Sequence, residues 1–88
     1  MQEDIDIINK LGLHARAAAK LVKLAAGFES SIDIEKDGKR VNGKSIMGVM
    51  MLAASCGSTV TLHVDGADEN EAMEALKTLI NQRFEEDE

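Results

Sequence analysis

The segment Thr59-Val60-Thr61-Leu62-His63-Val64-Asp65 alternates polar and apolar side chains without interruption. A period of two is typical of a β-strand that buries one face, so the pattern predicts that Val60, Leu62 and Val64 point into a core. A strand of this kind needs partner strands and a layer of apolar residues over its dry face. The rest of the chain is therefore expected to supply half-buried strands and amphipathic helices.

Three further strands are predicted by shorter signals. Residues 4–8 and 31–35 alternate in the same way, and a return strand at 40–42 follows the turn signal Asp37-Gly38. Because every predicted strand alternates, the sheet should have one dry face and one wet face. That arrangement is typical of an antiparallel sheet with helices on one side.

The first two helices are predicted between these strands. In residues 15–26 the apolar side chains recur at the spacing of one helix face, and Gly27 stands where a C-cap glycine would. Residues 46–54 form a compact apolar run behind Ser45, a favourable N-cap, and the run closes at Gly57. In the first helix the core-facing positions are Ala18, Leu21, Val22 and Ala25.

A third helix is predicted after Asp68, which together with Glu71 resembles a capping box. Its apolar stripe consists of Ala72, Met73, Ala75, Leu76, Leu79 and Ile80. The acidic residues 85–88 are expected to form a frayed, solvated end. The element order is then βαββαβα. It predicts an α+β open-faced β-sandwich, a four-stranded antiparallel sheet with three helices on one face.

Composition limits the classes of function. The 88 residues predict one domain spanning 1–88, and with 44% hydrophobic and 2% aromatic residues the core must be aliphatic. A net charge of −6 argues against nucleic-acid binding, and no apolar run approaches a membrane span. The single cysteine, Cys56, rules out an internal disulfide and a Cys-x-x-Cys metal pair. We expect a cytoplasmic, soluble monomer that uses no cofactor and no metal.

The stretch Gly12-Leu13-His14-Ala15-Arg16 is the first candidate site. His14 falls just before the first helical residue, where unpaired backbone N–H groups and a partial positive charge bind anions. The same field disfavours an imidazolium and should keep the ring neutral and nucleophilic. If the ring captures a phosphoryl group, the N–H groups and Arg16 are placed to hold its oxygens. Gly12 would let the backbone turn tightly into the helix.

Spacing alone leaves a simpler interpretation open, in which His14 is an ordinary helix cap. The charge pattern supports the phosphoryl hypothesis, because residues 10–23 hold four basic and no acidic residues in an acidic chain. A local basic cluster of this kind can steer an acidic partner or an anionic group. Taken alone, Arg16, Lys20 and Lys23 would be a solvated helix face.

Residues 41–52 form the second candidate site. This stretch is too apolar for a short helix that packs on one side only, and its methionines are adaptable contact residues. Met47, Met50 and Met51 either complete the core, which the pattern alone favours, or leave an exposed patch that docks partners. Ser45 is most simply a structural cap. A phosphate on it would keep the helix, because a helix N-terminus tolerates negative charge, and would repel an acidic docking surface.

Both stretches resemble motifs of one family. Gly12-Leu13-His14-Ala15-Arg16 looks like the active-site signature of HPr, the histidine-containing phosphocarrier of the bacterial phosphotransferase system. Gly43-Lys44-Ser45-Ile46-Met47-Gly48-Val49-Met50 looks like the regulatory-serine signature of that family. The motifs lie about thirty residues apart, as in the family, and the whole chain follows its length and element order.

The resemblance implies a role for each matched residue. His14 would accept a phosphoryl group on Nδ1 from phospho-enzyme I, itself charged by phosphoenolpyruvate, and pass it to an enzyme IIA protein. Arg16 and the backbone N–H groups of Ala15 and Arg16 would hold the phosphoryl oxygens. Ser45 would match the serine that HPr kinase/phosphorylase modifies. The implied docking residues are Lys20, Lys23, Met47 and Met50. Such a protein is a transfer intermediate and not an autonomous enzyme.

One position departs from the family pattern, because Ala17 stands where the family usually has proline. Proline in the first helical turn costs no hydrogen bond and fixes φ, so Ala17 loses rigidity but adds an N–H near the phosphate. The departure keeps the nitrogen-related, NPr-like branch of the family open beside the sugar branch.

Two other functions compete with the phosphocarrier. A regulatory binding module would act mainly through the patch around Ser45, with His14 phosphorylation as a signal. A small hydrolase or metal site built on His14 and His63 is a weaker hypothesis, because two histidines and one cysteine spread over the chain make a poor ligand set. His63 is expected to be exposed and without a function, and Cys56 to be a buried or half-buried thiol. The sequence offers no recognisable general base for His14.

Overall fold

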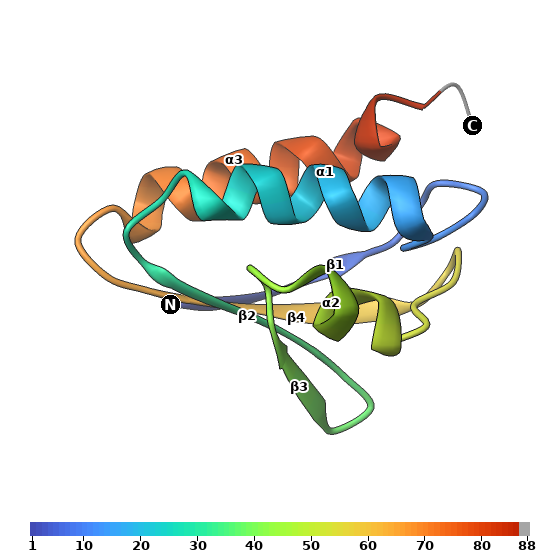
Figure 1. Cartoon of the computed structure of the whole chain (residues 1–88), viewed down its shortest axis with the longest axis horizontal. Coiled ribbons are helices and arrows are strands. Elements are labelled where there is room, and N and C mark those ends of the chain that lie inside the picture. The colour runs from blue at the N-terminus through green and yellow to red at the C-terminus, as the bar shows by residue number, and fades with distance from the viewer. Residues whose placement is uncertain (87–88) are drawn as a thin grey trace.

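The computed structural model describes residues 1–86, which form a four-stranded antiparallel sheet and three helices (Figure 1). The strands are β1 (Gln2–Asp6), β2 (Ser31–Lys36), β3 (Lys39–Asn42) and β4 (Thr59–Asp65). The helices are α1 (Ala15–Ala26), α2 (Ile46–Met51) and α3 (Glu69–Asn81), and a short turn, η1 (Arg83–Glu85), follows α3. This βαββαβα order confirms the predicted fold class.

The strand with the uninterrupted alternation, β4, lies inside the sheet, whose strand order is β1-β4-β2-β3. β4 pairs with β1 on one side, where Ile5 lies opposite Val60, and with β2 on the other, where Ile34 lies opposite Leu62. Val60, Leu62 and Val64 are fully buried, which confirms their predicted orientation.

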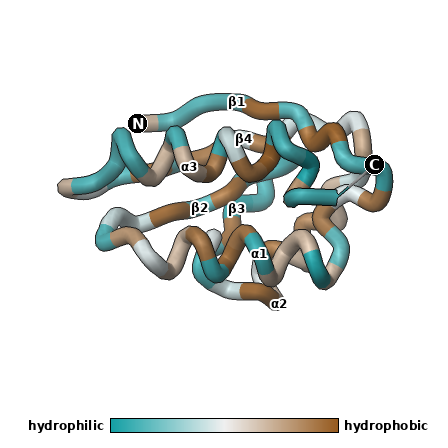
Figure 2. Tube along the Cα trace, turned by 90° about the horizontal axis from the view of Figure 1, so that it is seen from above, coloured by the Kyte–Doolittle hydropathy of each residue, from teal (hydrophilic) through white to brown (hydrophobic). Residues whose placement is uncertain are grey.

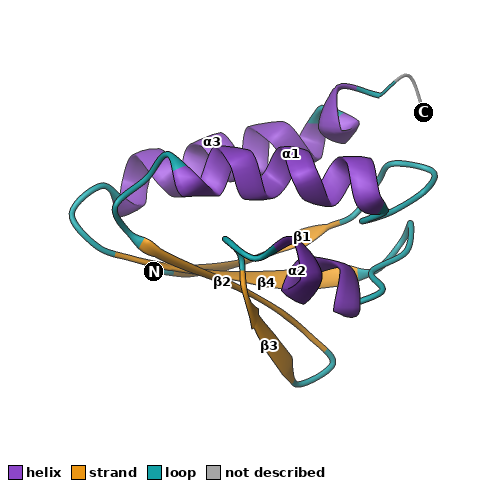
Figure 3. Ribbon diagram, viewed as in Figure 1, coloured by secondary structure: helices purple, strands orange, loops and turns teal. Residues whose placement is uncertain are grey.

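Two helices cover the dry face of the sheet. α1 and α3 lie side by side above the strands, and α2 packs against α1 and β3 (Figures 1 and 3). The core-facing side of α1 is largely alanine, with Ala18 and Ala25 fully buried beside Leu21. Among the predicted core positions, Val22, Ala75 and Leu79 are half-buried rather than buried.

The second helix differs from its prediction in length and in what it buries. α2 ends at Met51 rather than at residue 54, because the chain leaves the helix at Ala53, whose φ is +50°. Of its six residues only Val49 is buried. Because Met47 is 72% exposed and Met50 40%, the interpretation that the methionines complete the core is wrong. Brown in the tube at α2 in Figure 2 marks apolar residues, and four of them, Ile46, Met47, Met50 and Met51, are exposed.

Two predictions about helix ends are also wrong. Asp68 stands at the N-cap of α3 but makes no capping bond, because its carboxylate accepts hydrogen bonds from the backbone N–H groups of Glu29 and Ser30 instead. The described part of the acidic tail is not frayed. The side chain of Glu86 reaches back to α1, and Phe84 is fully buried. The remainder of that predicted solvated end, residues 87–88, lies outside the described residues.

Within residues 1–86 no helix is long and apolar enough to cross a membrane.

Candidate functional site

His14 is the N-cap residue of α1, as the sequence predicts, with an extended backbone (φ −73°, ψ 176°). Its ring makes no capping hydrogen bond, so His14 stands at the N-cap position but its side chain does not act as an ordinary cap. The first helical bond runs from the N–H of Ala18 to the carbonyl of His14 (2.8 Å). The N–H groups of Ala15, Arg16 and Ala17 have no acceptor among residues 1–86. Three donors at the positive end of the helix are therefore free beside the imidazole.

The loop before α1 is held rigidly against the loop that follows α2. The N–H of Leu13 donates to the carbonyl of Ala54 (2.8 Å). Gly12 has a φ of +66°, and a Cβ at this position would collide with the carbonyl oxygen of Ala54. Only glycine satisfies both the left-handed backbone and this close approach. The predicted tight turn into the helix is thus present, and it fixes the position of His14.

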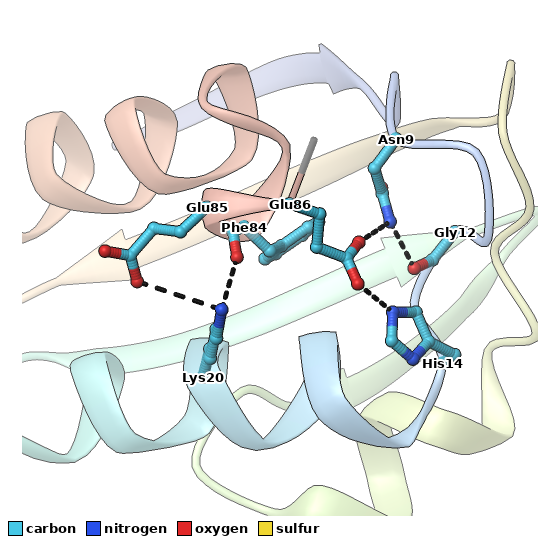
Figure 4. Close-up of polar contacts among 7 residues, drawn as sticks. All are labelled: Asn9, Gly12, His14, Lys20, Phe84, Glu85 and Glu86. Atoms are coloured by element: carbon cyan, nitrogen blue, oxygen red, sulfur yellow. Dashed lines mark hydrogen bonds and ion pairs between the residues drawn. The ribbon is translucent and has the colours of Figure 1, made fainter. Parts of the chain in front are cut away.

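A carboxylate from the end of the chain closes the site. Nε2 of His14 lies 2.7 Å from Oε2 of Glu86, and Nδ2 of Asn9 donates to Oε1 of the same carboxylate (3.0 Å; Figure 4). Nδ2 of Asn9 also donates to the carbonyl of Gly12 (2.8 Å). Figure 4 shows the other ring nitrogen of His14 on the side away from Glu86. The ring is 26% exposed, so a partner can reach it.

The pKa of Glu86 is lowered by these contacts. Burial raises the pKa of this carboxyl, but the hydrogen bonds from His14 and Asn9, with the charge of Lys20, outweigh burial. Glu86 is therefore an anion at neutral pH that accepts a hydrogen bond on each oxygen.

The segment after α3 engages one cation of the basic cluster that the sequence predicts, and so reduces the positive charge that the cluster can offer a partner. Nζ of Lys20 donates to the carbonyl of Phe84 (2.7 Å) and lies 4.0 Å from the carboxylate of Glu85. Lys20 is accordingly half-buried and engaged. Arg16 and Lys23 are exposed on α1, and Arg16 has no acceptor or ion pair among residues 1–86. The cation nearest to His14 in sequence is thus free to meet an incoming anion.

Ser45 and the exposed methionines of α2 lie next to each other. Ser45 is the N-cap of α2, and its hydroxyl oxygen accepts from the N–H of Gly48 (3.1 Å), which confirms its structural role. The exposed apolar residues on α2 are Ile46, Met47, Met50 and Met51, which we call the methionine patch. The serine lies at the N-terminal edge of this patch.

The remaining candidates do not join the site. His63 lies on β4 and is half-buried, with Nε2 2.7 Å from Oε1 of Glu35, so the expectation of an exposed histidine is wrong. Cys56 is exposed, contrary to its prediction. Residues 1–86 contain no group of three His, Cys, Asp or Glu side chains arranged to hold a metal ion.

Sequence reasoning missed Asn9 and Glu86. Both residues are polar and lie outside any periodic pattern, and Glu86 stands in an acidic run that is typical of a solvated end. The contact joins positions 72 residues apart, so neither local spacing nor composition could reveal it.

The fold and the imidazole at the N-terminus of α1 are those of a small protein that carries a phosphoryl group on histidine. The comparisons agree. A family model described as the phosphorylation site of the HPr component of the phosphotransferase system matches residues 1–82. The phosphocarrier protein HPr of Cupriavidus necator is 61% identical over 88 residues, covering 100% of this chain and 99% of that protein. HPr of Neisseria meningitidis is 56% identical with the same coverage.

A solved structure supports the same assignment. The crystal structure of HPr-C-His from Thermoanaerobacter tengcongensis matches with a TM-score of 0.96 at 50% identity, covering 100% of this chain and 99% of that one. The chain belongs to the HPr family of phosphocarrier proteins, which carry a phosphohistidine between enzyme I and enzyme II of the phosphotransferase system. It is a phosphoryl-transfer intermediate and not an enzyme.

Proposed function

We propose that His14 carries the phosphoryl group, accepting it on Nδ1 from phospho-enzyme I and passing it to an enzyme IIA protein. The observation that supports this most strongly is the position of the ring at the N-terminus of α1, beside N–H groups that have no acceptor within residues 1–86. Nε2 is engaged by Glu86, which leaves Nδ1 as the nitrogen available to phosphorus.

In the proposed step the lone pair of Nδ1 attacks phosphorus while the bond between phosphorus and the donor breaks. The phosphoryl oxygens then meet the N–H groups of Ala15 and Arg16, and the exposed guanidinium of Arg16 neutralises their charge. Each helix-end contribution is modest at an exposed site, about 0.3–1 kcal/mol. A reversible carrier needs its bound phosphoryl group to be stabilised only modestly, because it must release the group to the next protein.

The proposed docking surface is the methionine patch with the exposed cation of α1. Met47 and Met50 supply adaptable apolar contacts, and Lys23 adds positive charge for an acidic partner. Lys20 belongs to this surface through its stem, although its ammonium is bonded to the carbonyl of Phe84. Both enzyme I and an enzyme IIA would use this surface in turn.

Ser45 is the proposed regulatory site. A phosphate on this N-cap would add a charge of about −2 at the edge of the methionine patch without breaking α2. An acidic face of enzyme I would then be repelled. HPr kinase/phosphorylase is the enzyme class that would modify this serine.

Labelling tests the role of His14. The protein is incubated with enzyme I and labelled phosphoenolpyruvate, and an acid-labile, alkali-stable phosphate is expected in the wild type and in His63→Ala. His14→Ala should take up none. Uptake by His14→Ala, with loss in His63→Ala, would reject the proposed site. We expect the active protein to be a cytoplasmic monomer, which sedimentation of the purified chain checks for its oligomeric state.

A regulatory binding module remains the second candidate, because the methionine patch is exposed directly beside Ser45. In that case Ser45→Asp should change partner binding while His14→Ala leaves the contacts of the unphosphorylated protein intact. A phosphorylated protein that never transfers its label to any enzyme IIA would favour this function over the carrier.

A further inference from the structure

The end of the chain contributes a carboxylate to the site from outside the segment that the family model matches, which stops at residue 82. We propose that Glu86 is a positioning residue for phosphoryl transfer: it accepts a hydrogen bond from Nε2–H of His14 and so leaves the lone pair of the neutral imidazole on Nδ1. This inference rests on the proposed function, in which Nδ1 of His14 takes the phosphoryl group.

The hydrogen-bond pattern fixes which atom carries the proton. A carboxylate is only an acceptor, and the 2.7 Å distance from Oε2 of Glu86 to Nε2 of His14 requires a proton on the nitrogen. The other oxygen, Oε1, already accepts from Asn9. Because Glu86 has a lowered pKa, it is ionised when the imidazole is neutral. A neutral imidazole holds one N–H, so a proton on Nε2 leaves the lone pair on Nδ1.

The carboxylate of Glu86 is held in place because the segment around it packs and hydrogen-bonds against the rest of the fold. Phe84 is fully buried, and its carbonyl accepts from Nζ of Lys20 (2.7 Å). The side chain of Glu86 is only 17% exposed. Asn9, which is fully buried, links Glu86 to Gly12 in the loop that presents His14. The same loop thus orients both the imidazole and its partner.

The arrangement assists the chemical step in two ways. In the neutral ring, no proton has to leave Nδ1 before its lone pair forms the bond to phosphorus. As that bond forms, positive charge develops on the ring, and the carboxylate beside Nε2 stabilises it from the side opposite to the phosphoryl group. When the group is passed on, the electron pair returns to Nδ1 and the proton stays on Nε2.

Two substitutions separate this role from a merely structural one. Glu86→Gln keeps the shape but has one oxygen and one NH₂. Because Nδ2 of Asn9 needs an acceptor, the new carbonyl should face Asn9 and the NH₂ should face Nε2 of His14, which reverses the tautomer. Glu86→Ala removes the partner. Glu85→Gln is the matched control. It removes the same charge from the neighbouring residue, whose side chain is exposed.

The direct readout is the tautomer of His14, measured by long-range ¹H–¹⁵N NMR at a pH where the ring is neutral. The wild type and Glu85→Gln should show Nε2–H, Glu86→Gln should show Nδ1–H, and Glu86→Ala a mixture. His63 serves as the internal reference, because its Nε2 is paired with Glu35 and should not change. Phosphorylation by enzyme I should be about tenfold slower in Glu86→Gln and unchanged in Glu85→Gln.

Three results would overturn the inference. One is the same His14 tautomer in all four proteins, and another is a changed tautomer with an unchanged rate. The third is faster phosphorylation in both Glu86 variants, which would mean that the tail only covers the ring. Phosphorylation of His14→Ala would instead reject the proposed function, and it would leave the tautomer measurement standing.

Discussion

At the scale of single residues, the site depends on backbone donors and one cation that have no partner among residues 1–86. The N–H groups of Ala15, Arg16 and Ala17 belong to the first turn of α1, where no carbonyl of the helix can reach them. Proline in place of Ala17 would therefore cost no helix hydrogen bond. Unlike proline, the alanine has an N–H, and this N–H is an additional donor at the site. The chemistry of the site is set by these few groups rather than by a deep pocket.

Arg16→Ala tests the cation. We expect phosphorylation of His14 by enzyme I to slow by about tenfold or more, because a hydrogen bond to a charged group contributes about 1.5–3 kcal/mol. Thermal unfolding should be unchanged, since Arg16 is exposed and has no acceptor among residues 1–86.

Lys36→Ala is the control for Arg16→Ala. It removes an equal charge from β2, where the lysine pairs with its neighbour Asp37. Equal slowing in both variants would mean that net charge matters and that Arg16 has no specific role.

At the scale of elements, Ser45 has a structural and a regulatory role that can be separated. Ser45→Ala loses the hydrogen bond to Gly48 and should cost about 1 kcal/mol, which lowers Tm by about 4–8 °C in a domain of this size. Ser45→Asp can still accept that bond, so its Tm should stay near the wild type while phosphorylation by enzyme I slows. Calorimetry and labelling measure the two effects. A normal labelling rate in Ser45→Asp would remove the regulatory role.

Asp68 connects α3 to the turn between α1 and β2, and this connection should depend on pH. The hydroxyl of Ser30 and the N–H of Glu29 lower the pKa of Asp68 below its ordinary value of 3.8. A carboxyl with a lowered folded-state pKa stabilises the fold above its unfolded pKa, and the contribution is lost as the pH falls through the folded value.

Asp68→Asn should therefore unfold at lower urea concentration than the wild type at neutral pH, and the difference should shrink in acid below that lowered pKa. Urea unfolding at a series of pH values measures this. A difference that stays constant with pH would show that the ionised carboxylate is not the stabilising species.

The elements differ in how far local sequence determines them. β4 and α1 have the predicted bounds, because an uninterrupted period of two and an alanine-rich amphipathic run are strong local signals. The predicted capping box at Asp68 is wrong because its carboxylate accepts hydrogen bonds from the N–H groups of Glu29 and Ser30, which are far away along the chain. The exposure of α2 was equally hidden, since composition does not say which side of an apolar helix is covered.

At the scale of the whole molecule, the site is completed by the packing of the C-terminal turn onto α1. His14, Arg16 and Ser45 could be found from the sequence because each stands in a motif at a helix start. Asn9 and Glu86 could not, because their contact with the site depends on where η1 places the chain after α3. Arg83, Phe84 and Glu85 all have positive φ, which turns the chain back toward α1.

Phe84→Ala tests this closure. Removing a fully buried phenyl ring should cost about 3–5 kcal/mol, a large part of the stability of so small a domain. Urea unfolding measures the loss. In the Phe84→Ala variant, amide hydrogens of residues 83–86 should also exchange faster than those of β4. A variant as stable as the wild type would mean that the turn does not belong to the core.

The measurement that tests the central claim most directly is the location of the phosphoryl group by ³¹P and ¹H–¹⁵N NMR of the protein phosphorylated by enzyme I. The account predicts phosphorus bound to Nδ1 of His14, with the proton retained on Nε2. Phosphorus found on Nε2 of His14, or on His63, would contradict it.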